Sequence, residues 1–249
     1  MSLARDLAYA VDPALWVQDR LGVIPDPWQA DVLRSTAPRM LLNCCRQSGK
    51  SSVAAWLALH TALYRERALV LLLSPSLRQS GELFRKVIEA YRALGDAAPP
   101  EAESALRIEL KNGSRIVSLP GSEQTVRGYS GVNLLVCDEA SRIEDDLYRS
   151  VAPTLAVSRG RLLALSTPFG ARGWWYDAWH SDGWERVRIT AEQCPRIPRE
   201  FLERERRGMP DWAFRQEYLG EFADGAGQMF SSELIRQALS ADVRPLFGV

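Results

Sequence analysis

The chain has 249 residues and balanced charge, with 31 basic and 31 acidic side chains and a formal net charge of zero at neutral pH. This balance excludes a global basic field for nucleic acid, although a local basic loop or face is compatible with it. No stretch has the apolar length of a membrane span or the core of a signal peptide, and four cysteines without C-x-x-C spacing argue against a zinc site. We therefore expect no membrane partner, and nothing in the cysteine pattern points to an oxidising compartment.

The sequence before residue 40 predicts helices. Residues 3–21 have an amphipathic pattern that Asp12-Pro13 interrupts, and an aspartate followed by a proline is typical of an N-cap and the first helical position. Asp26-Pro27 repeats this signal, so a further helix is expected there. The apolar run Met40-Leu41-Leu42 then predicts a strand, and the Ala- and Leu-rich stretch 53–64 predicts a helix.

Between that strand and that helix, residues 44–52 read Cys-Cys-Arg-Gln-Ser-Gly-Lys-Ser-Ser. A strand, a short loop ending in Gly-Lys-Ser and a helix form the layout of a phosphate-binding P-loop. In such a loop backbone N–H groups cradle the phosphates, the lysine reaches the β- and γ-phosphates and the serine hydroxyl holds Mg²⁺. Cys44 occupies the place of the usual first glycine, so the motif is a variant. The residues predicted to bind nucleotide are Arg46, Gln47, Ser48, Gly49, Lys50, Ser51 and Ser52, with Ser51 also a ligand of Mg²⁺.

The following segment predicts a strand, a helix and a hairpin. Residues 68–74 are continuously apolar, and residues 76–94 have the period of a long amphipathic helix. Asn112-Gly113 then separates two β-like runs, residues 106–110 and 115–119. Asn-Gly between such runs is a strong signal for a tight turn, so we expect an antiparallel pair attached to a parallel sheet.

Two carboxylates follow the next apolar run, Leu134-Leu135-Val136-Cys137. A short run without alternation predicts a strand buried on both faces, and side chains at its C-terminal end emerge where ligands bind in open α/β sheets. Asp138 is therefore expected to hold Mg²⁺ through water, and Glu139 to orient and deprotonate an attacking water. Together with the P-loop, the pair predicts a site of nucleotide hydrolysis.

Three further motifs have a functional and a plain interpretation. Gln29, in Pro27-Trp28-Gln29, can pair its amide with the edge of adenine, or it can simply belong to a helix cap. Thr167, in the Ser166-Thr167-Pro168 that follows the predicted strand 162–165, can sense the γ-phosphate, or it can form a strand-end turn. Arg127, beside Gly128, suits an arginine finger inserted by a neighbouring subunit.

The order of these elements predicts an α/β fold of the RecA-like branch of P-loop NTPases, with a mostly parallel sheet flanked by helices. We expect the strand that ends at Glu139 to lie next to the P-loop strand. Apolar strands become scarce near the C-terminus, and the charged run 199–207 predicts a solvated helix. We therefore divide the chain into a core with an N-terminal helical segment, residues 1–185, and a small lid or linker subdomain, residues 186–249.

In this order and spacing, the motifs resemble the ATPase domain of large terminase subunits, the motors that pump DNA into the empty capsids of tailed phages. The resemblance covers roughly residues 25 to 230, and no single motif carries it. The matching segments are 27–29 as the adenine motif, 45–51 as a Walker A with an internal Arg46, Arg127-Gly128, 134–140 as Walker B with the catalytic Glu139, 166–168 as the coupling motif, and 214–222 as the sequence before the linker.

The resemblance implies that ATP hydrolysis with Mg²⁺ drives double-stranded DNA into a procapsid, in the cytoplasm of a bacterial host. The implied partners are the portal protein, the small terminase subunit and further copies of this chain in a ring, although an isolated fragment is compatible with a monomer. Arg127 would complete a neighbour's site in trans, with Arg142 as the alternative. Thr167 would couple loss of the γ-phosphate to movement of the lid.

Two other functions remain open at this level. A superfamily 2 helicase or translocase shares several of these motifs but needs a second RecA-like domain, for which the chain is too short. A scaffold with an inactive site is the other alternative, against which the intact Lys50, Ser51, Asp138 and Glu139 argue. Members of the terminase family normally continue into a nuclease domain, and because this chain stops at Val249 we expect no nuclease domain and no DNA cleavage from this polypeptide.

Overall fold

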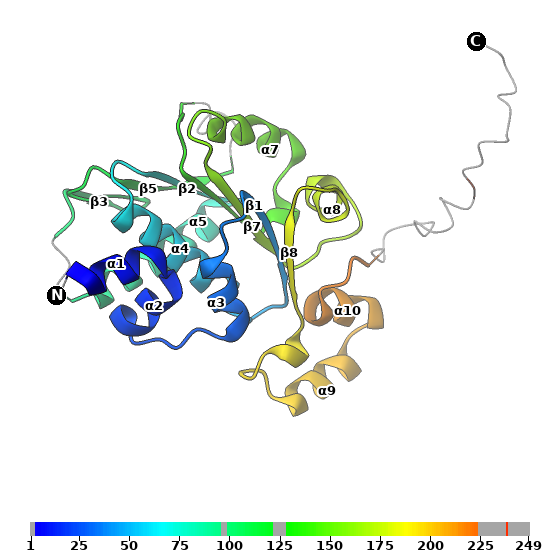
Figure 1. Cartoon of the computed structure of the whole chain (residues 1–249). Helices are drawn as coiled ribbons and strands as arrows, with labels where there is room; N and C mark the ends of the chain where they lie inside the picture. Colours follow the sequence, from blue (N-terminus) through cyan, green and yellow to red (C-terminus); the bar gives the residue numbers. More distant parts are fainter. Residues whose placement is uncertain (1–2, 96–98, 122–127, 224–237, 239–249) are drawn as a thin grey trace, which may run out of the picture.

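The computed structural model describes residues 3–95, 99–121, 128–223 and 238, which form a mixed sheet with helices on both faces (Figure 1). The strands are β1 (Arg39–Cys44), β2 (Leu69–Ser74), β3 (Ala102–Ser104), β4 (Arg107–Glu109), β5 (Arg115–Pro120), β6 (Leu134–Asp138), β7 (Arg161–Ser166) and β8 (Glu185–Ile189). The helices are α1 (Leu3–Val11), α2 (Pro13–Leu21), α3 (Pro27–Arg34), α4 (Lys50–Tyr64), α5 (Leu77–Ala93), α7 (Asp145–Val151), α8 (Gly173–His180), α9 (Arg199–Gly208) and α10 (Asp211–Leu219). Short 3-10 turns span Ala140–Arg142, Ala152–Leu155 and Ala191–Gln193.

The sheet has the order β3-β4-β5-β2-β6-β7-β1-β8. All neighbours from β5 to β8 pair in parallel, whereas β3 and β4 pair antiparallel at one edge. The predicted hairpin is confirmed, because β4 and β5 flank a turn in which Gly113 has a left-handed φ of 78°. The short strand β3 precedes the predicted hairpin, in a segment for which the sequence predicted no strand. The mostly parallel sheet with an antiparallel addition is therefore confirmed.

The expected neighbourhood of the acidic strand is wrong. β6, which ends at Asp138, pairs with β2 and β7, and it is β7 that pairs with the P-loop strand β1. All four central strands are buried on both faces, so the apolar pattern alone allows any of them to lie beside β1. Pairing partners are decided by the crossover connections, which the periodicity of the residues does not specify.

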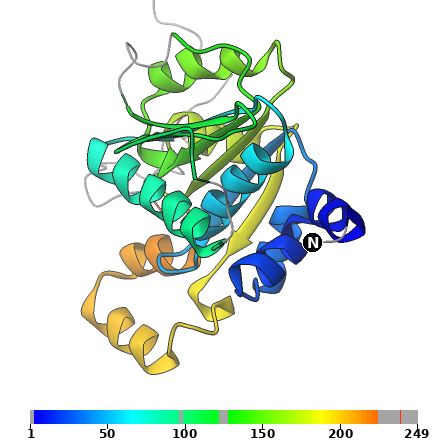
Figure 2. The ribbon, with the colours of Figure 1, turned by 90° about the vertical axis from the view of Figure 1, so that its left-hand side faces the viewer.

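Two layers of helices cover the sheet, since alternate residues of its strands point to opposite faces. Leu42 and Val136 face the cluster formed with α1 to α5, and Leu41 and Leu135 face the cluster formed with α7 and α8. Figures 1 and 2 show α4 and α5 side by side on the first of these faces. The parallel strands thus end at a single edge, with helices on both sides, and the P-loop lies at that edge.

The starts of the N-terminal helices are confirmed. The Asp12 side chain accepts hydrogen bonds from the N–H groups of Ala14 and Leu15, at 3.0 Å each, and Pro13 begins α2. Asp26 and Gln29 form a capping box at the start of α3. Both aspartates therefore satisfy backbone donors that a helix N-terminus leaves free.

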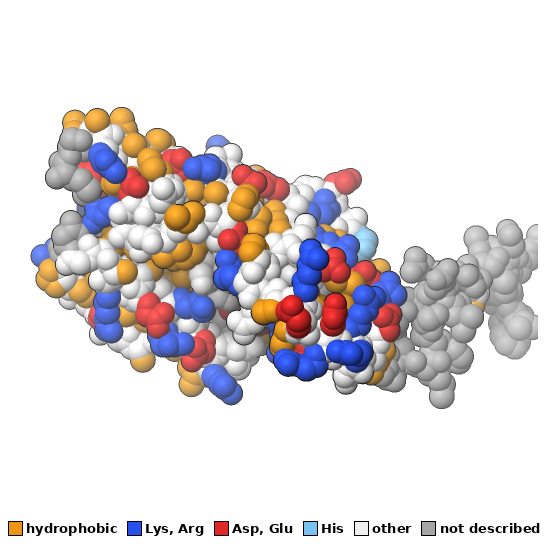
Figure 3. Space-filling view, turned by 90° about the horizontal axis from the view of Figure 1, so that it is seen from below, with side chains coloured by type: hydrophobic (Ala, Val, Ile, Leu, Met, Phe, Trp, Pro, Cys, Tyr) orange, Lys and Arg blue, Asp and Glu red, His pale blue; other side chains and the backbone are white. Residues whose placement is uncertain are grey.

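The sheet continues past the predicted boundary at residue 185. β8 begins at Glu185 and pairs with β1 through Ile189, so the residues beyond the sheet begin after Ile189. We call residues 190–220 the C-terminal segment; it contains α9 and α10. The run predicted as a solvated helix is α9, in which Leu202 alone is buried. From the side on which α9 lies in Figure 1, basic and acidic side chains are closely interspersed (Figure 3). None of the helices in the described ranges has the length and apolarity needed to cross a membrane.

Candidate nucleotide site

A cavity of about 660 Å³ lies at the end of β1 and the start of α4. It brings together most of the predicted P-loop residues with the predicted catalytic Glu139. The cavity is also lined by Gln79 and Lys86, which the sequence did not single out. Arg142, which the sequence suggested only as a residue acting on a neighbouring subunit, lines it as well. The complete lining is Arg46, Gln47, Gly49, Lys50, Ser51, Ser52, Gln79, Lys86, Glu139 and Arg142.

The P-loop has an unusual backbone that presents its amides at the start of α4. Gln47 and Gly49 have left-handed φ values of 61° and 91°, and helix α4 begins at Lys50. Only glycine adopts such a conformation without strain, which explains Gly49. The Ser48 hydroxyl is buried and has no hydrogen-bond partner within the described part of the chain. A helix N-terminus preceded by such a loop is suited to bind anions.

Lys50 links the P-loop to the end of β7. Its side chain is buried, and Nζ donates to Oγ1 of Thr167 over 3.3 Å. The same hydroxyl donates to the carbonyl of Cys44, at 3.2 Å. Thr167 therefore contacts both the lysine and the backbone of the P-loop strand. A plain strand-end turn does not require either bond, and the sensing of the γ-phosphate by Thr167 stays a prediction.

The acidic pair lies where β6 ends. Asp138 is almost completely buried, and Glu139 has a left-handed φ of 50°, with its N–H donating to Oδ1 of Asp138 over 3.1 Å. Burial, with the nearby Glu139 second, raises the pKa of Asp138 to about 6, while Lys50 opposes the rise. A buried carboxylate beside another carboxylate fits a divalent cation, because hard cations prefer such oxygen ligands.

Ser141 is a site residue that the sequence did not reveal. Its hydroxyl donates to the carbonyl of Thr167 at 2.8 Å and lies 2.7 Å from the Ser166 hydroxyl. Its N–H also donates to the Ser166 hydroxyl over 3.2 Å. The residues after β6 and β7 are thus directly joined. The only available signal was the position of Ser141 two residues after Glu139, which is too weak to assign such a contact.

The structure places Gln29 in the helix cap. Its Oε1 accepts a hydrogen bond from the N–H of Asp26 at 2.9 Å, and its side chain is buried. Its Nε2 lies against the P-loop, 2.7 Å from where a Cβ at Gly49 would stand. The capping interpretation is therefore favoured in this arrangement. The predicted contact with adenine stays a prediction, and it would require the amide to leave the cap.

Arg46 is paired with the C-terminal segment. Its Nε donates to Oε2 of Glu217 in α10 over 2.6 Å, and its N–H donates to the Glu217 carbonyl over 3.4 Å. Asn43, at the end of β1, donates to the Gly220 carbonyl over 2.8 Å. The sequence predicted a phosphate contact for Arg46, and the residue does line the cavity, but its guanidinium is engaged by a carboxylate.

Arg127 and Arg142 are the two candidates for the arginine finger. Arg127 lies outside the described residues. Arg142 lines the cavity of its own subunit, and its Cζ lies 4.0 Å from the centre of the Phe169 ring. A cation stacked on an aromatic ring is held in place, so Arg142 is held at the cavity of its own chain.

The α5 contribution could have been found from spacing. Gln79 and Lys86 are seven residues apart, which places them on one face of a helix two turns apart. Lys86 is also one of only three lysines in the chain, with Lys50 and Lys111. Its charge helps to lower the pKa of Asp138, so it adds positive potential to the site.

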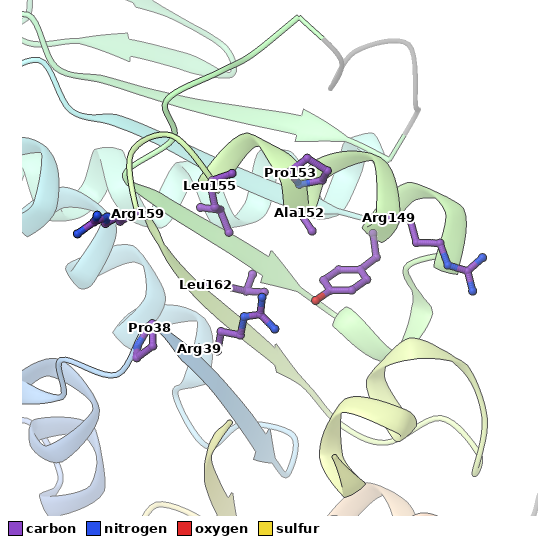
Figure 4. A pocket seen from close by; sticks show the side chains of 11 residues that line it. Pro38, Arg39, Arg149, Ala152, Pro153, Leu155, Arg159 and Leu162 are labelled. Atoms are coloured by element: carbon purple, nitrogen blue, oxygen red, sulfur yellow. The ribbon is translucent and has the colours of Figure 1, made fainter. Parts of the chain in front are cut away.

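A second cavity, of about 650 Å³, lies at the other end of the parallel strands, where β1 and β7 begin (Figure 4). Tyr148 also lines this cavity, and Arg39 points toward its middle, whereas Arg149 and Arg159 point away. The described residues that line this cavity include no residue of the P-loop and no carboxylate. In the described part of the chain, no three His, Cys, Asp or Glu side chains form a group that could hold a metal ion.

Comparison with solved structures identifies the fold. The ATPase domain of the large terminase of Thermus phage P74-26 superposes with a TM-score of 0.76 at 24% identity, covering 85% of this chain and 99% of that one. The large terminase of bacteriophage HK97 gives a TM-score of 0.69 at 15% identity over 85% of this chain and 55% of that one. The large terminase of bacteriophage D6E, solved with ADP, gives 0.64 at 16% identity over 80% of this chain and 54% of that one. The RecA-like fold is therefore confirmed.

Sequence comparison agrees with the structural one. The terminase large subunits of Thermus phage G20c and Escherichia phage T5 are 27% identical over 250 residues and 28% identical over 228 residues. Each alignment covers 85% of this chain and 51% of the relative, so the chain spans about half the length of the curated relatives it matches. The profile of the family described as terminase large subunit, T4-like virus type, N-terminal, matches residues 41–237. The chain therefore belongs to the terminase large subunit family and carries its N-terminal region.

Proposed function

We propose that this chain is the ATPase motor domain of a phage large terminase, which hydrolyses ATP to drive double-stranded DNA into a procapsid. The observation that carries the proposal is the contact between Lys50 and Thr167 at the edge of a cavity that Glu139 also lines. It joins the residue that would bind phosphate to the residue that would report its loss. The D6E relative binds ADP, which supports a nucleotide as the ligand here.

The chemistry follows from the positions of these side chains. The phosphates of ATP would rest on the amides of residues 46–52 at the start of α4, with Lys50 between the β- and γ-phosphates. Glu139 lines the cavity and would orient the attacking water and accept its proton. Ser51 and Asp138 would hold Mg²⁺, which neutralises charge on the phosphates when it is bound. Lys86 and Arg142 would add positive charge from the same chain.

The coupling route would pass from Thr167 to the C-terminal segment. Loss of the γ-phosphate would change the partners of Lys50, and with them the position of Thr167. Gly170, three residues later, donates its N–H to the side chain of Gln216 in α10 over 3.2 Å. A shift at the end of β7 would therefore reach α10 directly, and its displacement would move DNA held by the assembly.

Assembly belongs to the proposal as well. A homo-oligomeric ring on the portal would let Arg127 of one subunit complete the site of the next, while Arg142 would act within its own chain. Double-stranded DNA, the portal protein of the procapsid and the small terminase subunit are the proposed partners, in the host cytoplasm. We further propose that this polypeptide does not cleave DNA, a prediction that incubation of the chain with plasmid and Mn²⁺ would check.

The test is ATP turnover as a function of protein concentration, for the wild type and for Lys50→Ala, Arg127→Ala and Arg142→Ala. We expect Lys50→Ala to lose nucleotide affinity, and unchanged affinity would refute the P-loop assignment. Specific activity should rise with concentration in the wild type and stay low in Arg127→Ala. Arg142→Ala should lower turnover equally at every concentration, because its group acts in cis. A rate that rises with concentration in Arg127→Ala would move the finger elsewhere.

A further inference from the structure

Arg196 joins three separate segments around the nucleotide cavity. Its Nη1 and Nη2 donate to the two carboxylate oxygens of Asp26, at 2.9 and 2.7 Å. Nη2 also donates to the carbonyl of Ser48, at 2.8 Å. A single guanidinium of the C-terminal segment therefore holds the start of α3 and the backbone of the P-loop. Such a bidentate pair fixes orientation as well as distance, which a lysine cannot do.

The bond to Ser48 fixes the peptide unit that precedes Gly49. A trans peptide is planar, and its C=O and N–H point in opposite directions. Because the Ser48 carbonyl faces Arg196, the N–H of Gly49 faces away from it, and Gly49 lines the cavity. Glycine peptides rotate more easily than others, so this orientation needs an external partner to be maintained. Arg196 supplies that partner.

The pair with Asp26 acts on the same loop indirectly, through Gln29. Asp26 is only partly exposed, with 18% of its side chain accessible, and its N–H donates to the Gln29 side chain. The Gln29 amide in turn packs against Gly49, where a Cβ would be too close. Arg196 thus binds the Ser48 carbonyl directly and, through Asp26, helps to hold Gln29 against the loop. Both actions keep the loop in one shape before the ligand arrives.

We propose that Arg196 is a positioning residue for the nucleoside triphosphate, acting through the peptide unit between Ser48 and Gly49. The inference rests on the proposed function, since it concerns the same cavity. It makes the affinity for nucleotide depend on residues outside the P-loop. The affinity for nucleotide is set by where the C-terminal segment stands, because moving that segment withdraws Arg196 from the loop.

The experiment compares Arg196→Ala, Arg196→Lys and Asp26→Asn with Arg199→Ala, which removes the same charge from an exposed position three residues later. Titration with a fluorescent ADP analogue gives the dissociation constant, steady-state assays give kcat and KM for ATP, and thermal unfolding without nucleotide gives stability. We expect Arg196→Ala to raise the dissociation constant and KM roughly tenfold, the effect of losing about one charge-assisted hydrogen bond, with kcat nearly unchanged. Arg196→Lys should recover only part of the affinity, and Asp26→Asn should lose less than Arg196→Ala.

The outcomes separate positioning from mere structural support. A lower unfolding temperature in Arg196→Ala with unchanged nucleotide affinity would overturn the proposal, since the contacts would then only stabilise the fold. Equal loss of affinity in Arg199→Ala would overturn it too, because net charge would explain the result. The Lys50→Ala variant keeps the two hypotheses distinct. If it loses binding while Arg196→Ala does not, the inference fails and the proposed function stands.

Discussion

The central strands and the C-terminal segment both contact the P-loop, but through different kinds of interaction. β1, β6 and β7 are buried on both faces, and their side chains pack into the two apolar clusters of the core. The C-terminal segment also packs apolar side chains into one of these clusters, among them Leu202, Phe214 and Tyr218, but its contacts with Arg46 and Ser48 are polar. It reaches the P-loop through the ion pair of Arg46 with Glu217 and the bonds of Arg196.

This difference separates contacts that stay fixed, those of the packed strands, from polar contacts that can exchange one partner for another. Apolar side chains find no equivalent partners in water, so the packed strands hold Asp138 and Glu139 in constant positions. A guanidinium bound to a carboxylate can pass to a phosphate at little cost, because both present oxygens of similar geometry. The core therefore supplies the chemistry, and the polar contacts of the C-terminal segment supply a connection that nucleotide can alter.

The largest expected effect on turnover comes from a substitution at the end of the central strands. Glu139→Ala should retain ATP binding and lower turnover by at least about a hundredfold, the usual contribution of a positioned general base. Single-turnover assays combined with nucleotide titration would measure both. The exposed Glu144, five residues later, offers Glu144→Ala as the matched control. Retained hydrolysis in Glu139→Ala would move the base to another residue.

A second prediction concerns the buried charge of Asp138. Its pKa is near 3.8 in an unfolded chain and about 6 in the folded one, so the folded chain binds this proton more tightly. Stability should therefore fall as pH rises from about 4 to about 6, and ionisation at pH 7 should cost on the order of 3 kcal/mol. Asp138→Asn should remove this cost and raise the free energy of unfolding while abolishing Mg²⁺-dependent turnover.

Denaturant unfolding without nucleotide or Mg²⁺, at pH 7 and at pH 5, checks this prediction. The stabilisation should be smaller at pH 5, where the wild-type carboxyl is already mostly protonated. The same carboxyl gives the activity a pH limit, because only the ionised form can hold Mg²⁺. Turnover at a fixed, subsaturating Mg²⁺ concentration should fall as pH drops, because protons compete with Mg²⁺ for this carboxyl. Equal stabilisation at both pH values would mean that the charge is not the cause.

The smallest effect is expected at the exchangeable contact. Arg46 is 65% exposed and Glu217 is 23% exposed, so their ion pair is largely screened by water. If Glu217 competes with phosphate for Arg46, Glu217→Gln should raise the affinity for ATP by about two- to threefold. Isothermal titration with a non-hydrolysed ATP analogue would measure it.

The neighbouring Glu221 provides the control for that variant. Glu221 pairs with Arg215 and Arg188 rather than with the P-loop, so Glu221→Gln should leave affinity unchanged. A weaker affinity in Glu217→Gln would mean that Glu217 positions Arg46 instead of competing for it. That result would place the C-terminal segment among the fixed parts of the site, and the contrast between the two regions would no longer hold.

Much of the fold follows from local signals in the sequence. Asp12, Asp26 and Asn112-Gly113 act on their own neighbourhoods, and the structure has a helix start or a turn at each. Gly49 and Lys50 are fixed by the chemistry of phosphate binding. The order of strands is different, because it depends on contacts between residues far apart in the chain. The place of β7 between β1 and β6 could not be deduced from the apolar pattern.

The missed site residues have the same explanation. Ser141 and Arg196 carry no motif of their own, and the segment 214–222 was matched without a role for Glu217. Each of the three residues is meaningful only through a partner distant in sequence. Their contacts span from 26 residues, for Ser141 with Thr167, to 171 residues, for Glu217 with Arg46. Gln29 shows the opposite case, since a residue with a motif-like position is held by a local cap.

The position of β7 has a mechanical consequence. β1 and β6 share no hydrogen bonds with each other, and each is paired along its length with β7. Any sliding of the phosphate-binding strand against the strand of the acidic pair must therefore shear the ladders of this one strand. β7 ends in Ser166 and continues into Thr167, which are bonded to Ser141 on one side and to Lys50 on the other. A displacement between the two halves of the site must therefore pass through β7. It would change the hydrogen bonds at the C-terminal end of this strand first.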